Sequence, residues 1–189
     1  MALPHAILVS LCEQSASGYE LTRRFDRSIG YFWSATHQQI YRTLRTMEVD
    51  GWVSATVVVQ HGRPDKKVYT VSDAGRAELA RWIAAPLGSG AAAKGGALTE
   101  LAVKLRGAAH GDSTALREQI LALRAERAQL LDTYQGFEKK QFPDPAALRD
   151  SALHQYLVLR GGIRTEEGTI DWLDEVAAAL APKPKQENR

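Results

Sequence analysis

The stretch "SATHQQIYRTLRTMEVDGW", residues 34–52, determines how the first half of the chain folds. Thr36 and Gln39 have the spacing of a capping box, in which each side chain binds a backbone amide that the first helical turn leaves free. Three apolar residues then recur at helical steps of four and three, and they are Ile40, Leu44 and Met47. Gly51 suits the left-handed position that follows a helix end. The pattern predicts a helix over residues 37–50 with one buried edge.

The opposite edge of this predicted helix carries groups that bind base edges and phosphates. Its residues are His37, Gln38, Tyr41, Arg42 and Arg45. Gln38 suits paired bonds to adenine, and Arg42 suits paired bonds to guanine. Tyr41, together with Ser34 and Thr36 near the helix start, suits contact with phosphate. Exposed Gln and Arg are also ordinary solvated residues, so this edge alone does not establish a nucleic-acid site.

The elements on both sides of this helix complete the order of a known domain type. Pro4 suits the first turn of a preceding helix, and a second helix is predicted from about residue 18. The β-branched segments "WVSATVVVQ" and "VYTVS" predict two strands, and Ser72 is placed to cap a fourth helix that ends at Pro86. Three helices, a two-stranded hairpin and a further helix make up a winged helix-turn-helix. Such a domain places its third helix in a DNA major groove, which is about 12 Å wide.

The turn between the two predicted strands, "HGRPDKK", is basic. Arg63, Lys66 and Lys67 are predicted at the tip of this hairpin, the wing, where they would supply sequence-independent attraction to phosphates. Lysines at such a position also solubilise a protein or keep a strand edge from pairing. The order of the elements, more than any one residue, favours DNA binding by residues 1–86.

Beyond residue 86 the strand signals end and the pattern becomes helical. The segment "PLGSGAAAKGG" is rich in small residues, and residues 87–96 are assigned to a linker. Helices are predicted over residues 97–109, from about residue 113 to "FPDP", and from a cap at Asp144 to Leu180. Residues 97–181 form the predicted helical domain, and residues 182–189 a disordered tail. The expected fold is mainly α, with an N-terminal winged helix-turn-helix before an all-α dimerisation domain of long, coiled-coil-like helices.

The two long helices carry more apolar surface than a short helical hairpin covers, which favours an interface with a second copy. The candidate interface residues are Leu116, Ile120, Leu123, Leu130, Tyr156, Ile163, Ile170 and Leu173. Arg127 interrupts the heptad seam; it is either paired across the interface or pointing outward at a break in the heptads. A monomeric helical bundle is the alternative interpretation of the same pattern.

Composition narrows the class of protein. The chain has 189 residues, 44% of them hydrophobic, and a formal charge of +2, which neither requires nor excludes a nucleic-acid partner. The sequence contains no apolar run of about 18 residues, so no membrane span is expected. A single cysteine, Cys12, rules out an internal disulfide and fits a cytoplasmic protein.

No arrangement of residues typical of catalysis is evident in the sequence. Cys12 lies on an apolar helix stripe, so it is interpreted as a core thiol rather than a nucleophile. The five histidines are scattered without metal-ligand spacing, and no glycine-rich phosphate loop occurs. We therefore expect neither an enzyme nor a bound metal or cofactor. Trp82, Trp172 and Tyr156 suit either the core or a cavity for a small effector.

Three segments together resemble the PadR family of transcriptional regulators. They are "GYELTRRF", "FWSATHQQIYRTLRTMEVDGW" and "GRPDKKVYTVSDAGRAELARWI", and the resemblance spans about residues 4–85. The later segment "LRGGIRTEEGTIDWLDEVAAAL" is similar to the final helix of members with a long C-terminal domain, the AphA-like group of virulence activators. Between these parts, residues 86–145 match by helical character only.

The resemblance implies a homodimer whose C-terminal helices pack on those of the partner copy and whose two winged domains meet successive major grooves. In the family the third helix enters the groove and the wing touches DNA. This carries over to Thr36, His37, Gln38, Tyr41 and Arg42 of the helix and to Arg63, Lys66 and Lys67 of the wing.

Many relatives repress genes and release DNA when they bind a small molecule, often an aromatic one. The expected function is therefore a repressor that binds an inverted-repeat operator in double-stranded DNA, with a small aromatic effector as a further partner. A winged domain that binds only other proteins is the alternative.

Overall fold

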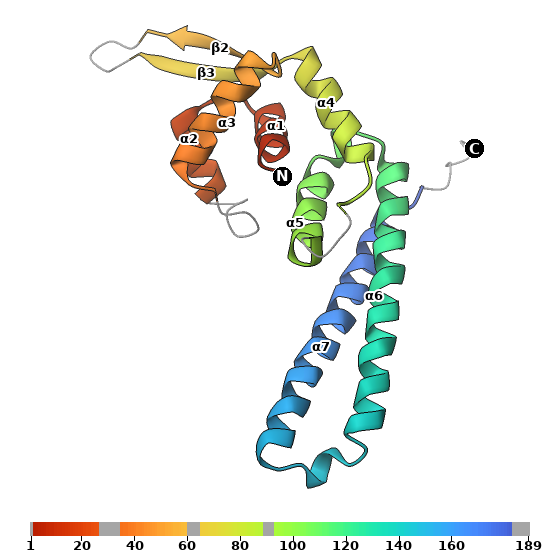
Figure 1. Cartoon of the computed structure of the whole chain (residues 1–189). Coiled ribbons are helices and arrows are strands. Elements are labelled where there is room, and N and C mark those ends of the chain that lie inside the picture. Colours follow the sequence, from red (N-terminus) through yellow and green to blue (C-terminus); the bar gives the residue numbers. More distant parts are fainter. Residues whose placement is uncertain (1, 27–34, 60–64, 89–92, 183–189) are drawn as a thin grey trace, which may run out of the picture. The chain divides into compact units, whose positions relative to one another are not determined.

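The structure, a computed structural model, describes residues 2–26, 35–59, 65–88 and 93–182 (Figure 1). The described chain is mainly helical and includes one small sheet of three strands. Contacts between residues divide it into two compact units, residues 1–116 and residues 117–189.

Four helices of the N-terminal unit follow the predicted order. They are α1 (Leu3–Glu13), α2 (Gly18–Arg24), α3 (His37–Val49) and α4 (Asp73–Ala84). In α3 both halves of the predicted capping box are present, since the amide of Gln39 donates to Thr36 Oγ1 and the amide of Thr36 donates to Gln39 Oε1. The three apolar residues of its inner edge are at most 1% exposed. The predicted amphipathic helix is therefore confirmed, and its outer edge is left to solvent.

The sheet contains the predicted hairpin and one strand that was not predicted. Strand β2 (Val53–Val58) pairs antiparallel with β3 (Lys66–Val71), and the two-residue strand β1 (Ala16–Ser17) pairs with the other side of β3. Strand β1 is too short for periodicity to reveal, and its partner lies far along the chain. Its pairing with β3 joins the start of α2 to the wing.

The helix α5 (Ala93–Arg106) and the turn η2 (Ala108–His110) belong to the N-terminal unit rather than to a separate helical domain. The Lys104 ammonium is buried and donates to the carbonyl oxygen of Ala85, and Arg106 forms an ion pair with Glu13 at 2.7 Å. These contacts hold α5 to α1 and to the end of α4. The compact units consequently divide at residue 116, not at the predicted linker over residues 87–96, and α5 begins inside that stretch.

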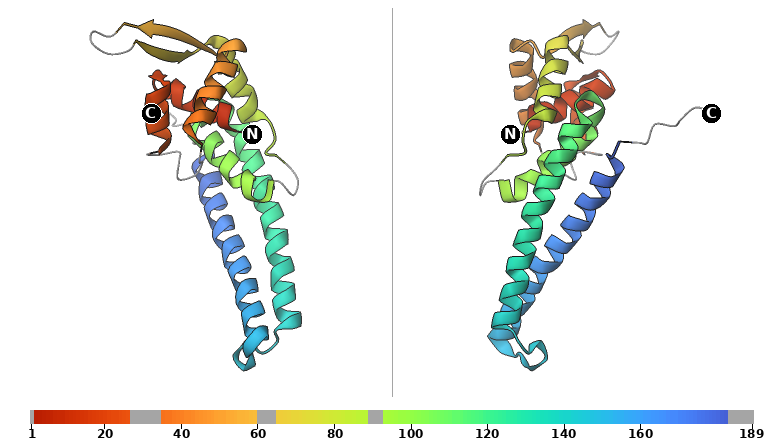
Figure 2. Two further views of the ribbon diagram at one scale, coloured as in Figure 1. Left: turned by 60° about the vertical axis from the view of Figure 1, so that its left-hand side comes forward. Right: turned by 90° about the vertical axis from the view of Figure 1, so that its right-hand side faces the viewer.

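Two long antiparallel helices dominate the C-terminal part of the chain (Figures 1 and 2). They are α6 (Ser113–Gln141) and α7 (Asp150–Ala179), joined through the turn η3 (Pro145–Ala147). The prediction that Asp144 caps the last helix is wrong, because Asp144 makes no side-chain cap and Leu148 is extended. Arg149 instead donates to the carbonyl oxygens of Ala146 and Leu148, which closes the turn before α7 begins.

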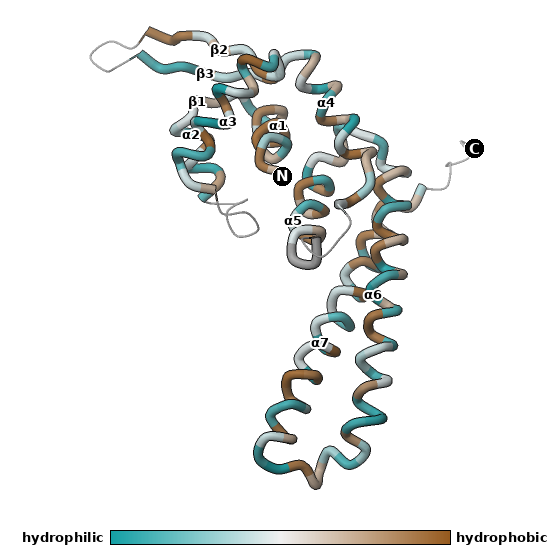
Figure 3. The backbone as a smooth tube through the Cα atoms, in the orientation of Figure 1, coloured by the Kyte–Doolittle hydropathy of each residue, from teal (hydrophilic) through white to brown (hydrophobic). Residues whose placement is uncertain are grey.

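Much of the predicted dimer seam is buried within the single chain. Six of its residues are at most 8% exposed, namely Leu116, Ile120, Leu123, Ile163, Ile170 and Leu173, whereas Leu130 and Tyr156 are half-buried. Figure 3 shows hydrophobic residues recurring along both helices of the hairpin. Arg127 pairs with Glu166 of the same chain at 3.6 Å, so of the two alternatives left open the outward orientation does not hold, and the partner found here belongs to the same chain. The assignment of the seam to a dimer interface stays a prediction.

Candidate nucleic-acid interface

The outer edge of α3 is open to solvent along its length. Its exposed residues are Thr36, His37, Gln38, Tyr41, Arg42 and Arg45. The edge begins at the helix N-terminus, where free backbone amides and the helix dipole favour an anion. Thr36 contributes its hydroxyl to the cap rather than to the open surface. The arrangement presents amide, imidazole, phenol and guanidinium groups side by side.

Tyr41 connects this edge to α2. A Cβ atom at Gly18, the first residue of α2, would overlap the Tyr41 ring, so the ring lies directly on the glycine backbone. The same side chain is 43% exposed. His37 lies 3.8 Å from the carboxylate of Asp26, which follows α2, and both side chains are exposed. Both contacts orient the first half of α3 against α2.

The arginines of this edge are available to a ligand. Within the described parts of the chain, no carboxylate lies within ion-pair distance of Arg42 or Arg45. A guanidinium without a protein partner keeps its donors free for paired bonds to a guanine edge or to phosphate oxygens. The guanidinium groups of Arg42 and Arg45 on the outer edge of α3 are therefore open to a ligand.

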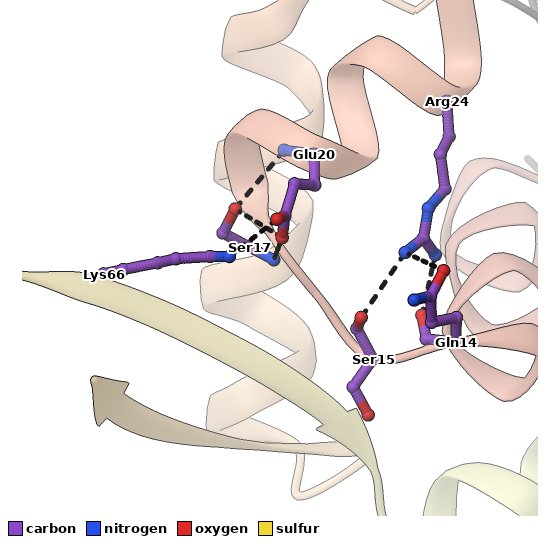
Figure 4. Close-up of polar contacts among 6 residues, drawn as sticks. All are labelled: Gln14, Ser15, Ser17, Glu20, Arg24 and Lys66. Carbon is purple, nitrogen blue, oxygen red and sulfur yellow. Dashed lines mark hydrogen bonds and ion pairs between the residues drawn. The ribbon is translucent and has the colours of Figure 1, made fainter.

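The two wing lysines are placed differently from the prediction. Lys66 and Lys67 are the first residues of β3 rather than tip residues, and each forms an ion pair. Lys66 Nζ lies 2.6 Å from Glu20 Oε1 of α2 (Figure 4), and Lys67 Nζ lies 2.8 Å from Glu48 Oε2 of α3. The hydrogen bond from Lys66, with further bonds from Ser17, lowers the pKa of Glu20 to about 2. The bond to Glu48 raises the pKa of Lys67.

Comparison with known proteins agrees with this geometry. Residues 7–81 match the transcriptional regulator PadR-like family, and residues 99–181 match the virulence activator alpha C-terminal family. The "Probable transcriptional regulator Rv1176c" of Mycobacterium tuberculosis is 70% identical over 97% of this chain and 100% of its own length. This chain belongs to the PadR family of transcriptional regulators.

More distant PadR relatives cover nearly the whole chain as well. The negative transcriptional regulator PadR of Bacillus subtilis is 27% identical over 94% of this chain and 97% of its own. Its crystal structure with operator DNA aligns with a TM-score of 0.47 at 27% identity, over 95% and 99% of the two chains. The structure of the same protein in complex with p-coumaric acid aligns with a TM-score of 0.43 at 26% identity, over 96% of this chain and 100% of that chain. The structure of the virulence activator AphA of Vibrio cholerae aligns with a TM-score of 0.41 at 34% identity, over 94% of this chain and 97% of that chain.

In this PadR-family chain two predicted DNA-contact residues, Ser34 and Arg63, lie outside the described residues. The structure brings the other residues of α3 together on one edge, and it places Lys66 and Lys67 beside the two helices of the helix-turn-helix. Contact of any of these residues with DNA stays a prediction.

Three residues of this PadR site were not predicted from the sequence. Glu20 and Glu48 hold the wing lysines, and no local signal marks them, because their partners lie 46 and 19 residues away. Tyr19 of α2 was not predicted as a site residue either; its ring is 61% exposed, and the Arg23 guanidinium lies 5.9 Å from its centre.

Other kinds of site find no support in the part of this PadR regulator that the structure describes. No group of three His, Cys, Asp or Glu side chains there is arranged to hold a metal ion. None of the described helices has the length and apolarity needed to cross a membrane. Trp82, one of the aromatic residues considered for an effector cavity, stacks on His5 with ring centres 4.3 Å apart.

Proposed function

We propose that the chain is a homodimeric repressor that binds an inverted-repeat operator through α3 and the wing. The observation that carries the proposal is the exposed outer edge of α3, where Arg42 and Arg45 have no ion-pair partner among the described residues. Gln38 and Arg42 read bases, and Tyr41 with the helix N-terminus holds phosphate. The name of the Bacillus relative, a negative regulator, supports repression rather than activation.

The homodimer is required by the reading geometry. A repressor that recognises an inverted repeat holds two reading helices about 34 Å apart, one helical turn of DNA. The support in this chain is apolar surface on the α6–α7 hairpin that one chain leaves uncovered. Phe137 of α6 is 44% exposed, and Leu157 and Val158 of α7 are 55% and 77% exposed. A second hairpin packed on this surface would remove it from water.

A small aromatic molecule is the proposed effector. Between α6 and α7 lies an open surface pocket of about 450 Å³, which is within the size range of small-molecule sites. Its walls are mostly aromatic and aliphatic with two glutamines, and the lining residues are Tyr134, Phe137, Gln141, Phe142, Gln155, Val158, Leu159 and Gly162. Such walls suit a planar ring with a hydrogen-bonding substituent. A ligand bound here would act on the α6–α7 hairpin, which in the proposed dimer holds the two winged domains together.

The experiment that tests the proposal is selection of bound duplexes from a random library, followed by affinity measurements on the selected duplex and on a shuffled one. Arg42→Ala or Gln38→Ala should weaken the selected duplex by about 1–3 kcal/mol and the shuffled duplex far less. Arg164→Ala, which removes an exposed arginine of α7, is the control for loss of charge. Equal losses on both duplexes would reassign Arg42 and Gln38 to phosphate contact. Failure to enrich any duplex, even at low salt, would favour the protein-binding alternative.

A further inference from the structure

The start of β3 is clamped between two helices. Lys66 and Lys67 are neighbours in a strand, so their side chains leave on opposite faces of the sheet. One ammonium meets Glu20 of α2 and the other meets Glu48 of α3. All four side chains are partly exposed, between 31% and 47%. Both ion pairs are therefore open to solvent.

Glu20 is held in position independently of the lysine. Its Oε2 atom accepts the Ser17 amide at 2.8 Å, and the Glu20 amide donates to Ser17 Oγ, which together form the capping box of α2 (Figure 4). The same Oε2 atom also accepts the Ser17 hydroxyl at 2.9 Å. Its Oε1 atom is left to accept from Lys66. The carboxylate is thus a fixed anion that faces the wing, and while Lys66 and Ser17 donate to it these hydrogen bonds lower its pKa to about 2.

The position of Glu48 on α3 bears directly on the proposed DNA contact. It follows Tyr41 and Arg45 at steps of four and three along α3, so it extends the same outer edge that faces the proposed DNA. A carboxylate there repels phosphate unless a cation covers it. Lys67 is that cation. Each wing lysine therefore cancels an acidic group of the helix-turn-helix instead of adding its charge to the surface.

We propose that Glu20 and Glu48 withhold the wing lysines from DNA phosphates until α3 is seated in the groove. The inference rests on the proposed DNA binding. Exposed ion pairs of this kind are weak, so a phosphate brought close to the wing by a fully seated α3 can displace the carboxylate. A phosphate on a loosely bound duplex is not held there and does not displace it. The lysines then strengthen the operator complex selectively.

Replacing each carboxylate by an amide tests this exchange. Glu20→Gln should preserve the cap of α2, because Gln39 already serves at the equivalent position of the α3 cap. In Glu20→Gln and in Glu48→Gln, one lysine becomes free for any phosphate. The shuffled duplex should bind about two- to fivefold more tightly. The slope of log affinity against log salt on this duplex should steepen by about 0.9 for each lysine released. The selected operator duplex should gain at least as much affinity, because its lysines no longer have to leave a carboxylate, and its slope should stay unchanged, since the lysines already contact phosphate there.

Two further variants separate the exchange from a general effect of charge. Glu13→Gln removes the same charge from the ion pair with Arg106 on α5 and should leave the slope unchanged. Adding Lys66→Ala to Glu20→Gln should abolish the gain. Thermal midpoints near that of the wild type confirm that each variant is folded.

The outcomes distinguish this inference from the function on which it rests. If the glutamine variants bind the shuffled duplex no better than the wild type, or more weakly, the carboxylates position the lysines rather than withhold them, and the inference fails. In that case Arg42→Ala should still bind the operator duplex more weakly than the wild type, because the proposed function does not depend on the carboxylates. If the wild type binds no duplex at all, the proposed function fails and this inference with it.

Discussion

Gly75 of α4 lies directly against the backbone carbonyl oxygen of Trp52. A Cβ atom at this glycine would overlap that oxygen and also approach Val71 at 3.0 Å. The same carbonyl accepts the amide of Ser72, and the Ser72 hydroxyl in turn accepts the amide of Gly75 in the N-cap of α4. The end of α3, the hairpin and the start of α4 therefore meet where only a glycine fits.

Gly75→Ala should destabilise the protein by about 1–3 kcal/mol, because neither the carbonyl nor the cap can move without loss of hydrogen bonds. Gly136→Ala is the matched control, since this helical glycine of α6 has open space around it, and the alanine should be neutral or slightly stabilising. Thermal unfolding followed by circular dichroism measures both. Equal midpoints for the two variants would show that α4 shifts freely away from Trp52.

His5 makes the stability of the N-terminal unit depend on pH. Its ring stacks on Trp82, and Nε2 lies 2.9 Å from Glu78, so the neutral ring carries its hydrogen on Nε2 and donates to that carboxylate. Among the described residues Nδ1 has no hydrogen-bond partner. Burial, which Glu78 opposes, lowers the pKa of His5 from its ordinary value of 6.5. The folded state therefore binds this proton less readily than the unfolded state.

Stability should consequently fall as pH drops below 6.5, because protonation favours the unfolded chain. His5→Phe keeps the stacking on Trp82 and removes the titration, so its stability should change less between pH 7 and pH 5. Urea unfolding at several pH values measures the difference. His154→Gln replaces an exposed histidine of α7 and should retain the wild-type dependence. A His5→Phe curve parallel to that of the wild type would contradict the assignment.

The parts of the fold that local sequence rules specify were predictable. The spacing of Thr36 and Gln39 and the recurrence of Ile40, Leu44 and Met47 are properties of one helix, so α3 and its exposed edge follow from residues 34–52 alone. Pairings between distant residues were not predictable in the same way. Strand β1 needs β3 as its partner, and Glu20 needs Lys66, at separations that no periodicity records.

The long helices illustrate a second limit. A heptad seam indicates that an apolar edge must be covered, but it does not indicate by which helix. Here α6 and α7 come from one chain, and residues such as Ile120 and Leu173 are already buried in it. The same reasoning placed Arg127 either across an interface or outward, whereas Glu166 of the same chain is its partner. Which helix covers an apolar edge is therefore decided by the tertiary structure and not by the heptad pattern.

The Arg127–Glu166 pair is buried between α6 and α7, with side chains 14% and 9% exposed. Glu166 Oε2 has no hydrogen-bond partner among the described residues. Arg127→Leu leaves this carboxylate buried without its cation and should destabilise the protein by roughly 3 kcal/mol. Arg127→Leu combined with Glu166→Leu should recover most of that loss, since an apolar pair suits the seam.

The control for this pair lies one turn away in the same helix. Arg124 bonds Asp174 at 3.0 Å, but these side chains are 39% and 51% exposed. Arg124→Leu should therefore cost less than about 1 kcal/mol. Urea unfolding of the wild type and the three variants measures the comparison. A similar loss for Arg124→Leu and Arg127→Leu would mean that burial does not distinguish the two pairs.

Leu157 and Val158 of α7 are the apolar residues whose exposure the proposed dimer must explain. They are neighbours on the hairpin and remain 55% and 77% exposed in the single chain. If a second copy covers them, Leu157→Glu or Val158→Lys places an unpaired charge in the interface and should raise the dimer dissociation constant at least about tenfold. Val49→Lys, at an apolar residue of α3 that is 87% exposed, should leave the dissociation constant unchanged. Sedimentation at several concentrations measures the three variants; dimers of wild-type affinity in all three would place the interface on another face of the chain.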